Sequence, residues 1–246
     1  MQADQVNELV QQVRRLLPRV GGKKLYKMIR PELQTKNIKM GRDLFFDHLR
    51  NHNLLIRPRK QYMATTQSSH RFRIYDNLLL NRSLSGRNQA WMSDITYLRT
   101  DKGFCYLALI TDGWSRKIMG YDVSDSLELT GCLRALNNAL THLPAQHKLI
   151  HHSDRGFQYC SHSYTNLLKA NNIQISMAEK GNCYQNAIAE RVNGILKNEF
   201  YLDTKFADLT QARKATKQAI ALYNKYRPHL MLDYKTPDYV HYNYIK

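Results

Sequence analysis

The chain has 246 residues, of which 37 are Lys or Arg and 20 are Asp or Glu, so its formal net charge is +17. A positive charge of this size indicates a polyanionic partner, and nucleic acid is the first class to consider. No apolar run approaches the ~20 residues of a membrane-spanning helix. The N-terminal sequence also lacks the apolar stretch of a signal peptide, so we expect an intracellular protein without a membrane partner.

The first part of the chain predicts three short helices. Helical spacing of apolar residues favours residues 4–17, and a second segment, 23–33, is expected to break at Pro31. A third helix is expected over 41–56, and its members on one side are Leu44, Phe45, His48 and Leu49. We therefore predict a small all-helical N-terminal module over residues 1–56. It fits a helix-turn-helix DNA-binding module, but short basic helices are common elsewhere, and the pattern favours neither role.

The next segment, residues 57–88, is basic, polar and poorly periodic. This composition predicts a linker that could follow DNA phosphates, with Arg57, Arg59 and Lys60 as candidate contacts. A solvated linker that contacts nothing is an equally good interpretation.

From residue 89 the pattern changes to short β-rich segments and helices. Three strands joined by hairpins are predicted first, and helices then alternate with two further strands, which is typical of a mixed α/β sheet. The expected strands are 90–100, 104–113, 115–124, 147–154 and 173–177, and the expected helices are 126–142, 161–170 and 187–200. We assign this core to residues 89–206. Residues 207–246 then form a last helix, over roughly 207–225, and an irregular aromatic tail.

Two acids lie at informative places in this sheet. Asp94 is in the first predicted strand and Asp154 ends the fourth. In a mixed sheet these strands can be neighbours, which would bring the two carboxylates side by side. Carboxylates that close repel each other, and a hard divalent cation such as Mg²⁺ removes the conflict.

One face of the predicted helix 187–200 is polar. Its members, at i, i+4, i+7 and i+11, are Asn186, Glu190, Asn193 and Lys197. Apolar residues occupy roughly the other side, so this face can look toward the strand ends while the helix packs on the sheet. Glu190 would then complete a three-acid cluster, and Lys197 could hold a phosphate. An ordinary solvated acid is the alternative interpretation of Glu190.

Three clustered carboxylates suit phosphodiester chemistry. Cleavage needs an activated oxygen, a stabilised leaving oxygen and neutralisation of the phosphate, and two metal ions about 3.5–4 Å apart supply all three. Carboxylates suffice as protein ligands because Mg²⁺ keeps waters and accepts substrate oxygens.

Three sequence blocks carry a resemblance to a known family. The blocks are "WMSDITYL" (91–98), "HHSDRGFQY" (151–159) and "KGNCYQNAIAERVNGILKNEF" (180–200). They resemble the catalytic blocks of the DDE transposases related to retroviral integrases, above all the second-frame protein of insertion-sequence family three. That family has Asp, Asp, 35 residues and Glu, followed seven positions later by Lys or Arg; here 35 residues separate Asp154 from Glu190, and Lys197 follows at seven. The tail "YNKYRPHLMLDYKTP" (223–237) also resembles the family's.

The resemblance implies a fold and a site. The fold would be ribonuclease-H-like, a mixed five-stranded sheet flanked by helices. Asp94, Asp154 and Glu190 would be catalytic and would hold two Mg²⁺ ions, for which Mn²⁺ substitutes. Lys197 would contact the transposon end, and we add Asn186, Asn193 and Arg155 as candidate DNA contacts.

The implied function is a transposase catalytic subunit that cuts DNA at transposon ends and transfers the strand. The family implies a homo-oligomer on DNA that acts with, or fused to, an upstream helix-turn-helix protein, in the bacterial cytoplasm near the nucleoid. Two departures are Gln185, where the family usually has Asp, and Arg191, where many members have Ser or Ala. The role of Gln185 stays open. The alternatives are a structure-specific ribonuclease-H-like nuclease and a DNA-binding regulator or inactive remnant.

The remaining candidates favour structural roles. The four cysteines lie too far apart for a zinc knuckle or a redox pair, and we interpret them as isolated reduced thiols: Cys105, Cys132, Cys160 and Cys183. His151 and His152 would point to opposite faces of a strand, so we expect them to be structural or DNA-facing rather than metal ligands. Trp91 is expected to anchor the core.

Overall fold

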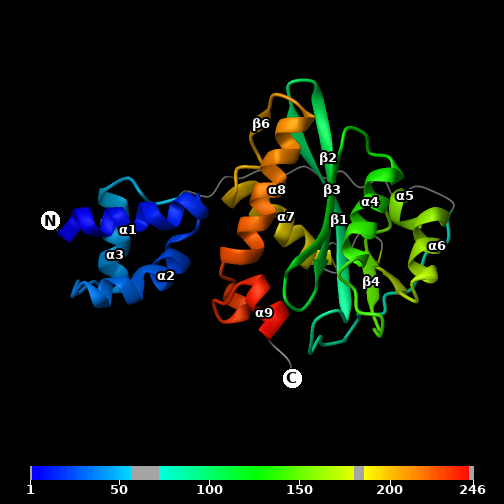
Figure 1. Ribbon diagram of the computed structural model, residues 1–246, viewed down its shortest axis with the longest axis horizontal. Coiled ribbons are helices and arrows are strands. Elements are labelled where there is room, and N and C mark those ends of the chain that lie inside the picture. The colour runs from blue at the N-terminus through cyan, green and yellow to red at the C-terminus, as the bar shows by residue number, and fades with distance from the viewer. Residues whose placement is uncertain (1, 57–71, 180–185, 244–246) are drawn as a thin grey trace.

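The computed structural model describes residues 2–56, 72–179 and 186–243. The centre of this part is a mixed sheet with the strand order β3-β2-β1-β4-β5 (Figure 1). The first three strands are antiparallel, and the next two run parallel to β1. Their bounds are β1 (Ala90–Thr100), β2 (Gly103–Asp112), β3 (Ile118–Ser124), β4 (Ile150–Ser153) and β5 (Gln174–Met177). The five predicted strands and the pairing of the first with the fourth are confirmed.

Helices cover both faces of the sheet (Figure 1). One face carries α4 (Leu129–Leu140), α5 (Phe157–Cys160) and α6 (His162–Ala170), and the other carries α7 (Ala187–Glu199) and α8 (Leu209–Tyr226). A two-residue strand, β6 (Lys205–Phe206), pairs with the far end of β1 and was not predicted. The short helix α5 was not predicted either, because four residues carry too little periodicity.

The alternation of side chains along β2 divides the apolar core into two layers. Leu107 and Leu109 belong to the cluster on the α7–α8 face, whereas Ala108 and Ile110 belong to the cluster on the α4–α6 face. Successive strand residues point to opposite faces, so a strand covered on both sides is apolar throughout. Trp91 is fully buried in the second cluster, which confirms its predicted role as a core anchor.

The N-terminal helices form a small bundle beside the core (Figure 1). They are α1 (Gln2–Leu16), α2 (Gly22–Thr35) and α3 (Arg42–Asn51). The prediction that Pro31 breaks the second helix is wrong. Leu25, Ile29 and Leu33 are buried on one side of α2, and their packing continues past Pro31, which lies on the exposed side, where water can satisfy the carbonyl freed by the proline. On α3, Phe45 and Leu49 are buried, whereas Leu44, which the sequence analysis placed on the same side, is 62% exposed.

The described half of the segment between this bundle and the sheet packs against the core. Phe72 lies 5.3 Å from Phe157 between ring centroids. The Leu78 amide donates to Ser176 Oγ at 2.9 Å, and Asn88 N donates to Asp112 Oδ2 at 2.7 Å. Residues 72–88 therefore belong to the packing of the core rather than to a free linker.

The C-terminal tail is more regular than predicted. It forms a 3₁₀ turn at Leu230–Leu232 and the helix α9 (Pro237–Asn243). Buried His241 holds α9 to the turn after β2, because its Nδ1 lies 3.0 Å from Ser115 Oγ, which donates to Asp112 Oδ1 at 2.8 Å. The expectation of an irregular tail was wrong because aromatic residues masked a helix that begins at a proline, a favoured first helical residue.

The packing of β3 on α4 depends on Gly120. A Cβ at this position would lie 2.2 Å from Ala135 O and 2.6 Å from Ala139 N, and both are backbone atoms of α4. Gly120→Ala should therefore destabilise the fold by about 2–3 kcal/mol or more, measured by urea unfolding. The control is Gly194→Ala in α7, where a Cβ meets nothing within 4 Å; there we expect stabilisation of ~0.5–1 kcal/mol. If Gly120→Ala and Gly194→Ala change the free energy of unfolding equally, the close packing of Gly120 on α4 is contradicted.

Candidate active site

Asp94 and Asp154 lie at the same level of two neighbouring parallel strands. The register pairs Met92 with His152, and each acid is two residues further along. Adjacent strands lie about 4.8 Å apart, and residues two apart share a face. Asp94 Oδ2 accepts from Asn193 of α7, and the charge of Asp154, just past the end of β4, adds to the burial that raises the pKa of Asp94, so the two carboxylates lie close together. This confirms the expected neighbourhood of the two acids.

Two asparagines attach α7 to β1 at this point. Asn186 Nδ2 donates to the Ser93 carbonyl at 3.1 Å, and Asn193 Nδ2 donates to Asp94 Oδ2 at 2.7 Å. Both asparagines are buried, at 4% and 6% exposure. Glu190 lies between them on the same helical face and is exposed. The polar face of α7 thus points toward the strand acids, as its spacing indicated.

The three carboxylates influence one another electrostatically. Burial raises the pKa of Asp94 to about 7, and the negative charges of Asp154 and, more weakly, Glu190 add to the shift. Burial and the charge of Asp154 also raise the pKa of Glu190. These shifts mean that negative charge accumulates at one place without enough nearby cations to balance it.

The loop after β4 holds Asp154 by its backbone. Gly156 N donates to Asp154 Oδ1 at 2.9 Å, and Ser153 Oγ donates to the Asp154 carbonyl at 2.9 Å. Arg155, a predicted DNA contact, donates from Nε to the Ala178 carbonyl at 2.8 Å. Its guanidinium therefore also ties this loop to the end of β5.

Lys197 is partly buried on the same helix, two turns beyond Glu190. Burial lowers the pKa of its ammonium group, and the negative charge of Asp94 opposes that shift. The predicted lysine is thus within electrostatic reach of the acids.

The donor set suits a hard cation in chemistry and charge. Carboxylate oxygens are the ligands that Mg²⁺ prefers, and the mutual repulsion of the three acids is the feature that a divalent ion relieves. In residues 2–56, 72–179 and 186–243, no group of three or more His, Cys, Asp or Glu side chains is arranged so that it could hold a metal ion.

A buried polar network beneath Asp94 was missed by the sequence analysis. His151 Nε2 lies 2.6 Å from Ser93 Oγ and 2.9 Å from the Tyr164 hydroxyl. Burial lowers the pKa of His151 to about 3, so the ring is neutral. Polar residues on a strand that is otherwise apolar were the available indication. Of the two interpretations of His151 and His152, the structural one is correct, because both are buried.

Several predicted residues lie outside the described part of the chain: Arg57, Arg59, Lys60, Cys183 and Gln185. The other three cysteines are free and buried, as interpreted: Cys105, Cys132 and Cys160. Within the described residues, no helix combines the length and apolar character required to cross a membrane.

Comparison with known proteins adds a family and a fold. Two family models, each described as "Integrase core domain", match residues 85–183 and 171–237. The "Insertion element IS600 uncharacterized 31 kDa protein" of Shigella sonnei is 35% identical over 214 residues, which cover 85% of this chain and 78% of that protein. "Transposase InsF for insertion sequence IS3A" of Escherichia coli (strain K12) is 36% identical over 183 residues, which cover 74% of this chain and 64% of InsF.

Among solved structures, the HTLV-2 integrase catalytic core domain in complex with magnesium has a TM-score of 0.51 at 21% identity, with 65% of this chain and 100% of that chain covered. A chain of the simian T-cell lymphotropic virus intasome has a TM-score of 0.52 at 19% identity, with 67% and 59% covered. These likenesses confirm the expected ribonuclease-H-like fold.

Proposed function

We infer that this chain, which belongs to the integrase core domain family of insertion-sequence transposases, cuts DNA at transposon ends and transfers the freed strand to a new phosphodiester. The observation that carries this inference is the meeting of Asp94, within β1, and Asp154, just past the end of the adjacent β4, beneath a helix that carries Glu190. The same place would perform both steps, because hydrolysis and strand transfer are attacks of an oxygen on a phosphodiester.

The cofactor in this proposal is Mg²⁺, with Mn²⁺ as a substitute and two ions per site, held by the three acids. Bound there, it would activate the attacking oxygen and neutralise charge on the phosphate and the leaving oxygen. The HTLV-2 core, which shares the fold, is described with magnesium.

The chain's own residues position these groups. The Asn193 amide donates to Asp94 Oδ2 and the Ile95 backbone N–H donates to Asp94 Oδ1, so both oxygens of this carboxylate are held in place. Lys197 places a cation beside the acids, where it would hold a phosphate of the transposon end. Ser93 and Tyr164 are fully buried, so neither is placed to attack DNA, in agreement with a reaction without a covalent protein–DNA intermediate.

The proposed partners are DNA and further copies of this chain on it. The net charge of +17 supplies the attraction for DNA. We propose that the N-terminal helices contribute DNA contacts and that an upstream helix-turn-helix protein acts with this chain. The location would be the bacterial cytoplasm, near the nucleoid.

The test of this function is nicking of supercoiled plasmid. Mg²⁺ or Mn²⁺ should be required, and chelation with EDTA should stop the reaction. Nicking that persists in EDTA would overturn the metal-dependent mechanism. The absence of nicking, even after the upstream protein has been fused to the chain, would overturn the enzymatic function.

Asn193→Leu should lower cleavage about 10- to 100-fold, the usual effect of losing a group that orients a metal ligand. We expect the Mg²⁺ concentration for half-maximal rate to rise and the melting temperature to change little, since leucine has the same branched shape as asparagine. Asn198→Ala is the matched control, because Asn198 is exposed on the same helix and donates only to the Gly194 carbonyl. An unchanged Mg²⁺ requirement for the Asn193 variant would rule out the positioning role.

A further inference from the structure

A half-enclosed pocket of about 600 Å³ lies between the N-terminal bundle and the core. Its walls come from the start of α2, from α7 and from the C-terminal segment 227–234. Arg191 of α7 lines it, and Arg191 directly follows Glu190. The α7 residues that line the pocket lie on the other side of the helix from its polar face, and none of the three acids lines the pocket.

The pocket carries an excess of positive charge. Four cationic side chains line it together with the exposed Lys23: Lys24, Arg116, Arg191 and Arg227. None of the described Asp or Glu residues lines the pocket; Glu199, outside the lining, pairs with Lys24 at 3.3 Å and with Arg227 at 2.6 Å. Arg191 and Lys23 add charge beyond those pairs. An anionic ligand is therefore the complementary one.

The wall also contains a buried polar atom without a protein partner. His229 is 8% exposed and lines the pocket, and its Nε2 forms no hydrogen bond within the described part of the chain. Burial and the surrounding cations lower the pKa of His229 to about 2, so the ring is neutral. A buried polar atom without a partner is costly and indicates a missing ligand.

Apolar and aromatic side chains make up the rest of the lining. Phe46, Ile188, Val192 and Tyr234 are among them. The first turn of α2, at Gly22 and Lys23, has no side-chain cap, so its backbone N–H groups add to the attraction for an anion. A ligand with one flat apolar part and one phosphate would match both halves of this surface.

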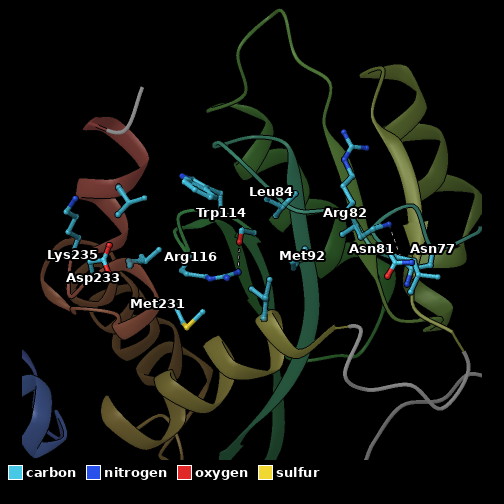
Figure 2. Close-up of a pocket in the computed structure, with 16 residues that line it drawn as sticks. Asn77, Asn81, Arg82, Leu84, Met92, Trp114, Arg116, Met231, Asp233 and Lys235 are labelled. Carbon is cyan, nitrogen blue, oxygen red and sulfur yellow. Dashed lines mark hydrogen bonds between the residues drawn. The ribbon is translucent and has the colours of Figure 1, made fainter. Parts of the chain in front are cut away.

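A second pocket, of about 580 Å³, is drawn in Figure 2 and shares part of its lining with the first. The two share Arg116, Ile188 and Met231, and Figure 2 shows Arg116 and Met231 on the same side of the space as Lys235. Arg82 lines the opposite side. Together the two pockets form one groove across the start of α7.

We propose that the first pocket holds one unpaired nucleotide of the DNA that the chain binds. Its phosphate would lie against Arg191, Lys23 and the start of α2, its base would pack on the apolar lining, and His229 Nε2 would hydrogen-bond to it. A duplex is too wide for this space, whereas an unpaired base can enter and stack. The proposal rests on the proposed function and adds a subsite for single-stranded DNA.

The test compares two DNA ligands by fluorescence anisotropy. One is a blunt duplex, and the other is the same duplex with a five-nucleotide single-stranded overhang. The full chain should bind the overhang ligand at least about 5-fold more tightly, as expected for one stacked base. Arg191→Ala and His229→Phe should reduce that preference to less than about 2-fold. Lys214→Ala, an exposed cation on α8, is the control and should retain it.

Two further measurements distinguish loss of the subsite from other causes. The melting temperature detects unfolding of a variant, and nicking tests the proposed function. His229→Phe should keep or raise the melting temperature, because it removes the buried Nε2, which has no hydrogen-bond partner among the residues that the structure describes. Metal-dependent nicking should persist in the control variant Lys214→Ala. A wild type that does not nick DNA would count against the proposed function instead. Two results would overturn the subsite. One is that folded Arg191→Ala and His229→Phe prefer the overhang ligand over the blunt duplex as strongly as the wild type does. The other is that a wild type that nicks DNA shows no such preference. If thymidine monophosphate saturates the pocket and the chain shows no preference for the overhang ligand, the ligand is a free nucleotide, and the proposed DNA subsite is overturned too.

Discussion

Asp154→Asn should abolish metal-dependent DNA cleavage, with a loss of about 10³-fold or more, and should leave DNA affinity within about 3-fold of the wild type. Asp94→Asn and Glu190→Gln should behave in the same way. A loss of about 10³-fold corresponds to ~4 kcal/mol of transition-state stabilisation, the scale expected when a ligand that organises the reacting charges is removed. DNA affinity should survive because it depends on the net charge of +17, which these changes make slightly more positive.

The fold should also survive these substitutions. The three acids repel one another, and burial raises the pKa of Asp94, so an amide at this position costs little stability. The control is Asp101→Asn, because Asp101 lies just beyond the other end of β1, where it pairs with Lys205 in an exposed ion pair. That variant should cleave like the wild type. Cleavage should be followed by conversion of supercoiled plasmid and binding by anisotropy. Parallel loss of cleavage and melting temperature would mean that the acids are structural.

Glu199→Ala should destabilise the protein by about 3–5 kcal/mol, because it leaves a buried cation without a partner. The Arg227 side chain is 1% exposed, and its guanidinium donates to both oxygens of Glu199 at 2.6 and 2.9 Å. Glu199 also receives Lys24 from α2, and its carbonyl accepts from Arg19 N at 3.2 Å. This carboxylate therefore holds the N-terminal bundle, α7 and the end of α8 together. Urea unfolding at pH 7 measures the effect.

Lys24→Ala is the matched control for that change. It removes the partly exposed cation but leaves the Arg227 pair intact, so its cost should be about 1 kcal/mol or less, as is typical of such pairs. If both variants lose a similar amount of unfolding free energy, the buried Glu199–Arg227 pair is not the main contributor to stability.

The pair of Glu199 with Arg227 also predicts that the protein loses stability in acid. Burial raises the pKa of Glu199, but hydrogen bonds and charges from Arg227 and Lys24 outweigh it, so the pKa lies below the ordinary value. A carboxyl with a lowered folded-state pKa contributes stability that is complete above its unfolded pKa of about 4.3 and is lost as the pH falls through the folded pKa. The urea midpoint should thus fall less between pH 6 and 3 in Glu199→Gln than in the wild type. An equal fall would show that other groups carry the acid sensitivity.

The acids of the site were predictable because their positions obey local periodicity. Asp94 and Asp154 end up side by side through the pairing of two strands, and each strand was recognisable from its apolar residues. The helical spacing of Glu190 and Asn193 placed both on one face. The family motifs then specified which acids belong together, which periodicity alone does not do.

Other features depend on contacts between distant segments and were not predictable. The continuation of α2 through Pro31 follows from the buried packing of Leu33. The pairing of Glu199 with Arg227 joins residues 28 positions apart on different helices. The contact of Asn193 with Asp94 spans 99 positions, and sequence spacing could not distinguish it from a DNA contact. In each case tertiary packing decided the outcome.

Strand joining tests the central claim most directly. A labelled duplex that carries the element's terminal sequence and a free 3′-hydroxyl is incubated with the chain, its upstream partner, Mg²⁺ and a target plasmid. The account predicts covalent joining of the labelled strand to the plasmid, lost with a 3′-deoxy end and lost with Glu190→Gln. Metal-dependent cutting of the target without any joining would contradict a transposase and identify a nuclease on the same fold.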